Sequence, residues 1–166
     1  IYIVDRRCVS AGIQILVNHA CKLRDSGLPA ASIAGELERL KERIRIFAVL
    51  DTLEYLRRGG RLSGFQAGLG AVTKLKPVVS VRDGSVVIAA KAFGAGAAVK
   101  QLKAHPVDDA FPSYFLYTDD KGREEMLLPQ LKAVNKLPLR LHYCSVGPTI
   151  GTHIGPGALG LAYMER

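Results

Sequence analysis

The spacing of apolar positions in the first fifty residues predicts helices and strands in alternation. Ile33, Leu37, Leu40 and Ile44 recur three or four residues apart, which is the spacing of one face of an α-helix. The continuous apolar run RIFAVL that follows is typical of a strand buried on both faces. In order, the pattern predicts a strand at 1–4 (IYIV), a helix at 10–27 capped by Ser10 and stopped by Gly27, a helix at 28–44 and a strand at 45–50.

The period of the pattern changes after residue 76. β-branched residues flank Asp83-Gly84, a dipeptide that favours a tight hairpin turn, so segments 77–82 and 85–90 should pair as antiparallel strands. Before this hairpin, Asp51 or Thr52 is placed to cap a short helix that Gly59-Gly60 ends. The other predicted elements are that helix at 52–58, helices at 64–75, 95–103 and 122–134, and strands at 113–118 and 139–146.

Strands that alternate with helices indicate an α/β fold. The 166 residues are enough for one medium domain or two small ones. A double glycine at 59–60 suggests a boundary near residue 62. We therefore expect residues 1–62 to be part of an open α/β domain, and residues 63–166 to be a smaller α/β domain whose mixed sheet contains the hairpin.

Composition narrows the functional classes. Hydrophobic residues make up 48% and charged residues 23%, as in ordinary globular proteins. No apolar run predicts a membrane span or a signal peptide. Cys8, Cys21 and Cys144 are widely spaced without a CxxC pair, which indicates reduced thiols of a cytoplasmic protein rather than a zinc site or disulfides. No metal and no cofactor is predicted.

The net charge of +8 is spread along the chain, with its densest clusters at 6–7, 41–45 and 57–61. A solvated surface is the default explanation. The basic clusters lack interleaved aromatic residues and any recognition motif, so no nucleic-acid partner is predicted. A small anionic ligand or an acidic protein partner would use the same electrostatic field.

The segment IGTHIGPGALG at 150–160 concentrates glycine around one histidine. It is no dinucleotide fingerprint, because a second strand and an acidic residue would have to follow and only six residues remain. His153 has no other metal-ligating residue at suitable spacing. Two explanations stay open here: His153 hydrogen-bonds within a turn, or it donates to a carboxylate or phosphate with help from Thr152, while Gly155 lets the ligand come close.

A second concentration is LRRGGRLS at 56–63. Arg57 and Arg58 fit the last turn of a helix, where cations complement the helix dipole. Arg61 lies beyond the double glycine, and an arginine in such a loop can bind an anion through two nitrogens. Ser10 stands at a helix N-terminus, where it can serve either as a plain N-cap or as a further anion ligand.

Three blocks in this order resemble the DegV family of bacterial fatty-acid-binding proteins, which includes the binding subunits of fatty acid kinase. They are DRRCVSAG, then DTLEYLRRGGRLSGFQAGLGAVTKLKPVVSVRDG, then GPTIGTHIGPGALGLAY. The resemblance covers essentially the whole chain and places it as the C-terminal part of a family member. It departs from the family at DRRCVS, where a small polar residue usually follows the aspartate.

The resemblance implies two α/β domains with a long-chain fatty acid in the slot between them. His153, Thr152, Gly155, Arg61 and Ser10 would bind the head group. Arg58 and Arg61 would face a separate kinase subunit that phosphorylates the carboxylate, so the chain itself would be a carrier rather than an enzyme. The family's upstream half-domain would supply further hydroxyls, and this isolated chain should bind fatty acid more weakly than the full-length protein.

A different class of function is an enzyme that acts on a small phosphorylated or carboxylated substrate, with His153 as general acid or base. A basic nucleic-acid-binding module is a third and weaker alternative.

Overall fold

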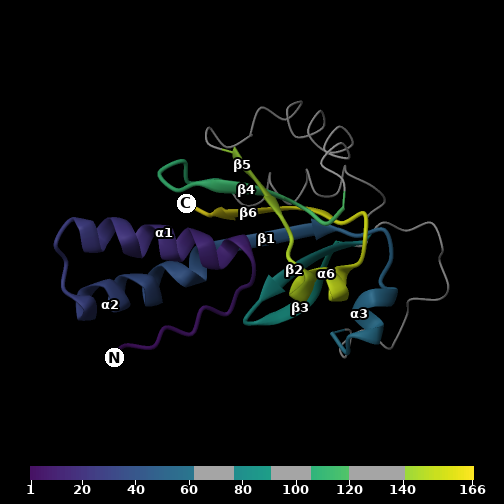
Figure 1. Ribbon diagram of the computed structural model, residues 1–166, viewed down its shortest axis with the longest axis horizontal. Coiled ribbons are helices and arrows are strands. Elements are labelled where there is room, and N and C mark those ends of the chain that lie inside the picture. The colour runs from purple at the N-terminus through teal and green to yellow at the C-terminus, as the bar shows by residue number, and fades with distance from the viewer. Residues whose placement is uncertain (62–76, 91–105, 120–140) are drawn as a thin grey trace.

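The strands of the protein form one six-stranded mixed sheet with the order β3-β2-β1-β6-β4-β5 (Figure 1). The structure is a computed structural model and describes residues 1–61, 77–90, 106–119 and 141–166. Neighbouring strands are antiparallel except for β4 and β5, which run parallel. The strands are β1 (Ile44–Val49), β2 (Val78–Arg82), β3 (Ser85–Ala90), β4 (Ser113–Tyr117), β5 (Leu141–Ser145) and β6 (Leu159–Met164).

Helices pack on this sheet near both ends of its central strands (Figure 1). Helices α1 and α2 pack side by side at one end, and the short helices α3 and α6 pack side by side at the other. The helices are α1 (Ala11–Asp25), α2 (Ala30–Leu40), the 3₁₀ turn η1 (Lys41–Arg43), α3 (Glu54–Arg58) and α6 (Pro148–Ile154).

The three helices predicted in the first sixty residues are present, but the one predicted at 28–44 ends at Leu40, is followed by the 3₁₀ turn η1, and leaves Ile44 to β1. Ser10 occupies the N-cap position of α1, although its hydroxyl makes no capping hydrogen bond. Gly27, at φ +82, follows the end of α1 in the left-handed region that glycine adopts without strain. Thr52 accepts a hydrogen bond from the Glu54 backbone N–H at 3.1 Å, but α3 begins at Glu54 with Leu53 in the N-cap position, so the helix starts two residues later than predicted.

The two strand predictions that rest on the clearest patterns are also confirmed. RIFAVL forms β1, which pairs with β2 on one side and β6 on the other. Its side chains are buried at four of six positions because both faces of a central strand are covered. Asp83 and Gly84 have φ values of 50° and 74°, so both central residues of the hairpin turn are left-handed, as the twist of the paired strands requires.

The strand predicted at the start of the chain was wrong, and no helix or strand was predicted for the glycine-rich segment near its end. Residues 1–4 form no strand, because within the described part of the chain no strand lies beside them, and Ile1, Tyr2 and Ile3 are exposed. The glycine-rich segment, in contrast, forms helix α6 and then β6, a central strand buried at every position. Glycine is uncommon inside strands, so Gly160 obscured the strand pattern; it lies inside β6, against the backbone of β1.

The helices predicted at 64–75, 95–103 and 122–134 fall on segments outside the described residues. The boundary predicted near residue 62 separates β1 from β2, yet these strands are hydrogen-bonded neighbours in one sheet. The chain therefore has an α/β fold with a mixed sheet and a hairpin, and the division into domains at 62 stays a prediction.

Candidate functional site

An apolar cavity of about 320 Å³ lies on the face of the sheet between α1, α3 and α6. Its volume is at the lower end of the range of small-molecule sites. Side chains from several strands line the cavity on one face of the sheet. The small residues Ala48 and Gly160 leave space above β1 and β6. Lining residues from the sheet include Ile46, Ala48, Val79, Leu116 and Gly160.

Three of the predicted site residues meet in this cavity. Ser10 at the start of α1, Arg61 after α3 and His153 on α6 all line it, although they are far apart in the sequence. Of the described residues that line the cavity, only Arg61 and His153 carry ionisable side chains. An apolar volume with a few polar donors and no carboxylate among those residues suits a ligand that is mostly hydrocarbon and ends in an anion.

Ser10 is held in an unusual backbone conformation, with φ 50° and ψ −130°. A serine rarely adopts a positive φ, and such strain persists only where the surroundings impose it. The Ser10 hydroxyl does not cap α1, while the Ser10 carbonyl accepts a 3.0 Å hydrogen bond from the Ile13 N–H. The backbone of Ser10 therefore starts the helix, and its side chain lies at the wall of the cavity.

Arg61 is placed by the way α3 ends. Gly60, at φ +69, takes the left-handed position after the C-cap Gly59, and the Arg61 N–H donates to the Leu56 carbonyl at 2.8 Å. This is the Schellman motif, in which glycine supplies the turn and the next N–H closes it. The Arg61 guanidinium donates to the Gly59 carbonyl at 2.8 Å and remains exposed. The motif uses the backbone of Arg61, so it does not require an arginine side chain there.

His153 lies in the last turn of α6 rather than in the glycine-rich turn where the sequence placed it. Its Nδ1 atom is buried and has no hydrogen-bond partner among the described residues. The imidazole packs against Gly59 at the end of α3 and also lines the cavity. It therefore does not hydrogen-bond its own turn through Nδ1, which weakens the purely structural explanation of this histidine.

The other three predicted site residues do not line the cavity. The Thr152 hydroxyl is exposed and donates back to the Thr149 carbonyl at 3.3 Å. Gly155 is buried against the ring of Tyr55, where a Cβ would overlap the ring, so this glycine allows α3 and α6 to approach. Arg58 is exposed and forms an ion pair with Glu54 at 2.7 Å. Ligand contacts by Thr152 and Gly155 and a partner contact by Arg58 stay predictions.

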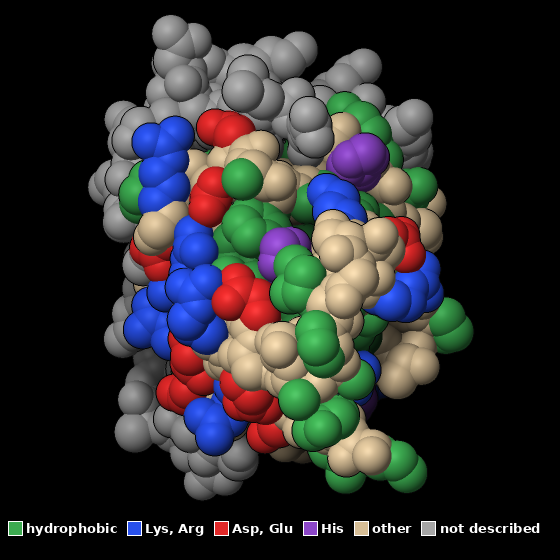
Figure 2. Space-filling model, turned by 90° about the vertical axis from the view of Figure 1, so that its left-hand side faces the viewer, with side chains coloured by type: hydrophobic (Ala, Val, Ile, Leu, Met, Phe, Trp, Pro, Cys, Tyr) green, Lys and Arg blue, Asp and Glu red, His purple; other side chains and the backbone are tan. Residues whose placement is uncertain are grey.

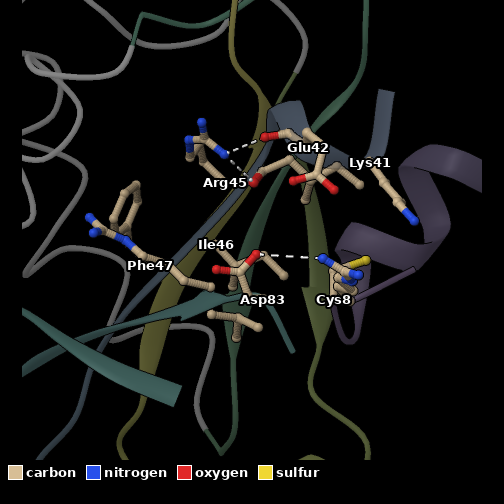
Figure 3. Close-up of a pocket in the computed structure, with 11 residues that line it drawn as sticks. Cys8, Lys41, Glu42, Arg45, Ile46, Phe47 and Asp83 are labelled. Atoms are coloured by element: carbon tan, nitrogen blue, oxygen red, sulfur yellow. Dashed lines mark hydrogen bonds and ion pairs between the residues drawn. The ribbon is translucent and has the colours of Figure 1, made fainter. Parts of the chain in front are cut away.

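A second, polar pocket of about 380 Å³ lies where the start of β1 meets the hairpin tip (Figure 3). The basic clusters at 6–7 and 41–45, which the sequence pattern indicates as solvated surface, lie together at this pocket. Arg7 lies 3.9 Å from Asp83, and Arg45 donates to the Glu42 carbonyl at 2.8 Å. Burial raises the pKa of the Cys8 thiol to about 11, so this cysteine stays protonated and unreactive at neutral pH.

The surface of the α1–α2 end shows Lys and Arg side chains next to Asp and Glu side chains (Figure 2). Ion pairs account for this mixture, since basic residues of the helices face acidic ones three or four positions away or next to them. Charges that are paired in this way give little net attraction for a polyanion. The pairs at this end are Arg24–Asp25, Arg39–Glu36 and Lys41–Glu38, and on α3, at the opposite end, Arg57 and Arg58 both pair with Glu54.

Within residues 1–61, 77–90, 106–119 and 141–166, no three His, Cys, Asp or Glu side chains gather as metal ligands would. In the same ranges no helix combines the length and apolar character that crossing a bilayer requires.

The sequence and the fold of this chain both match proteins of one family. The model of the DegV family, which describes uncharacterised proteins, matches residues 1–166. A DegV domain-containing protein of Streptococcus pyogenes serotype M3 is 33% identical over 164 residues, which are 97% of this chain and 57% of the relative.

Solved structures agree. A fatty-acid-binding DegV family protein from Thermus thermophilus is 31% identical with a TM-score of 0.82, over 98% of this chain and 60% of that one. A DegV family protein from Streptococcus agalactiae shows the same fold at 24% identity, with a TM-score of 0.84 over 99% of this chain and 59% of that one. The chain thus spans less than two thirds of these relatives, and it belongs to the DegV family.

Proposed function

We propose that this chain forms one wall of a binding site for a long-chain fatty acid and holds the carboxylate between Ser10, Arg61 and His153. The acyl chain would lie on the apolar floor that β1, β2, β4 and β6 provide. The relative from Thermus thermophilus binds fatty acid and shares this fold, which supports the same ligand class here. Binding of this kind requires no chemistry from the chain, and the protein would act as a carrier.

The observation that carries this proposal is that Ser10, Arg61 and His153, three of the five polar residues that line the cavity, meet at one apolar volume; the other two are Ser80 and Thr149. Burying a carboxylate in an apolar site is costly unless donors or cations compensate it. Arg61 supplies a charge, and Ser10 and His153 supply a hydroxyl and a ring N–H. Their positions 10, 61 and 153 in the chain share no local motif, so the fold alone brings them together.

Presentation of the carboxylate to a fatty acid kinase is the finer part of the proposal. Arg61 combines exposure with a place at the cavity, and Arg58 lies one turn away with its side chain 71% exposed. Cations at the mouth of a site can attract an acidic surface of a partner or the phosphates of its nucleotide. These two arginines would therefore meet the kinase, while His153 meets the ligand.

The enzyme alternative finds less support in the same geometry. General acid–base catalysis on a small substrate usually needs a second ionisable group near the histidine. Among the described lining residues the only other ionisable group is the Arg61 guanidinium, which has donors but no acceptor and so is not suited to act as a general base. The cavity is suited to holding an anion, and turnover of a substrate by the purified protein would contradict the carrier proposal.

His153→Ala in the full-length protein tests the proposal. Loss of one hydrogen bond to a charged group costs about 1.5–3 kcal/mol, or roughly tenfold to hundredfold in the dissociation constant for palmitate. The melting temperature should change little, because the variant also removes a buried nitrogen that has no partner. Calorimetric titration and a thermal melt measure the two effects. Unchanged affinity together with a large loss of stability would refute the head-group role.

A further inference from the structure

The position of the His153 imidazole depends on a residue of another helix. α3 ends at Gly59, and α6 carries His153 in its last turn beside it (Figure 1). A Cβ atom at position 59 would overlap His153 Nδ1 and lie 2.8 Å from its Cε1, closer than Cβ atoms come to other atoms in proteins. The ring therefore occupies the space that any other residue at position 59 would fill.

The backbone of Gly59 does not itself require glycine. Its φ of −77° and ψ of 0° lie in a region that every residue adopts in the last turn of a helix. The left-handed position belongs to the next residue, Gly60. Conformation thus explains the glycine at 60 but not the one at 59. The contact with the imidazole is what demands a residue without a side chain at 59.

The same contact selects which ring nitrogen carries the proton. Nδ1 faces Gly59 and has no partner in the described part of the chain. A proton on Nδ1 would bury an N–H without an acceptor, which folded proteins avoid. The neutral ring then keeps its proton on Nε2, so Nε2 is the nitrogen that can donate to an anion.

Gly59 also contacts the second ionisable residue of the cavity. Its carbonyl accepts the 2.8 Å hydrogen bond from the Arg61 guanidinium. Gly59 therefore contacts both Arg61 and His153, the two ionisable residues among the described lining of the cavity: its Cα faces the His153 ring and its carbonyl accepts from Arg61. A shift at position 59 would move the His153 ring directly and disturb the support of Arg61.

We propose that Gly59 is a positioning residue of the fatty-acid site. By leaving room for the Nδ1 edge of His153, it holds the imidazole with Nε2 available to the carboxylate. The inference rests on the proposed function, since it supposes that His153 serves the head group. The two glycines then have separate roles: Gly60 takes the left-handed conformation that ends α3, and Gly59 determines the position of the His153 ring.

Gly59→Ala displaces the ring without removing it and so tests the proposal in the full-length protein. We expect the dissociation constant for palmitate to rise roughly tenfold, the scale of one misplaced donor to a charged group. Adding Gly59→Ala to His153→Ala should weaken binding no further, because the ring it acts on is gone. Gly151→Ala is the matched control, since it lies on α6 with no atom within 4 Å of its Cβ and should leave affinity unchanged.

Nitrogen NMR of His153 gives a readout that does not depend on the ligand. The wild-type ring should show the tautomer with its proton on Nε2, and Gly59→Ala should change the tautomer ratio. If Gly59→Ala unfolds the protein, recovery of the melting temperature in the double variant would support the overlap with the ring. Failure of both variants to fold would make Gly59 a structural residue and overturn the proposal.

The binding data separate this inference from the proposed function. Wild-type affinity and tautomer in Gly59→Ala, with weakened binding in His153→Ala, would overturn the positioning role and leave the head-group role intact. Wild-type affinity in His153→Ala would instead refute the head-group role, and the role of Gly59 in ligand binding would fall with it.

Discussion

A substitution at Gly160 tests whether the close packing of β6 against β1 stabilises the sheet and shapes the cavity. It lies in β6 opposite Ala48 of β1 and Leu116 of β4, so strands pair with it on both sides. A Cβ added there would lie 2.5 Å from the Phe47 carbonyl oxygen and 3.3 Å from the Ala48 Cα. Both obstacles belong to the backbone of β1, which cannot turn away as a flexible side chain would.

Gly160→Ala should therefore destabilise the protein strongly. Overpacking a core costs about 1–3 kcal/mol, and the upper end applies because a hydrogen-bonded strand has to move. For a protein of this size, about 3 kcal/mol corresponds to a fall of roughly 6–12 °C in the melting temperature. The same shift of β1 would narrow the cavity, since Gly160 and Ala48 both line it.

Gly35→Ala is the matched control for this change. Gly35 lies on α2 with no atom within 4 Å of the position of its Cβ, so alanine should stabilise the helix by about 0.5–1 kcal/mol. Thermal melts of the two variants, followed by circular dichroism, should shift in opposite directions. A melting temperature for Gly160→Ala within a degree or two of the wild type would refute the packing argument.

Three further predictions follow from the site and its surroundings. Arg61→Ala in the full-length protein should weaken palmitate binding or phosphoryl transfer by a partner kinase with a nearly unchanged melting temperature, because within the described residues its exposed side chain donates only to the Gly59 carbonyl; a large loss of stability would make it structural. Arg58→Ala should lower the rate of phosphoryl transfer by the kinase and leave palmitate affinity unchanged. Arg24→Ala is its control, because Arg24 is a similarly exposed, ion-paired residue at the end of α1; equal effects of the two variants would argue against a specific partner contact. Hydrogen bonds from Arg57 and Arg58 lower the pKa of Glu54 to about 2, so its stabilising contribution is present above pH 4.5 and disappears as the pH falls toward 2. Glu54→Gln should flatten the dependence of the free energy of unfolding on pH in that window, and an unchanged pH dependence would contradict the ion pairs.

The sequence alone determined the elements that local chemistry controls. The hairpin follows from Asp83-Gly84, because few residues tolerate two successive positive φ angles. The ends of α1 and α3 follow from Gly27 and Gly60 for the same reason. The family resemblance also held, since it depended on three ordered blocks of residues rather than on any single motif.

The tertiary structure alone decided which residues meet. The apolar run LGLAYM is consistent with a buried strand, but only the tertiary structure explains the glycine within it, because the approach of β1 requires Gly160 and its own backbone does not. Likewise, Gly59 and His153 are adjacent only because α3 packs on α6, and Ser10, just before α1, lines the same cavity. Periodicity and turn chemistry act over a few residues, whereas the cavity is lined by residues up to 143 positions apart, 153 minus 10, and only the packed fold brings them to one place.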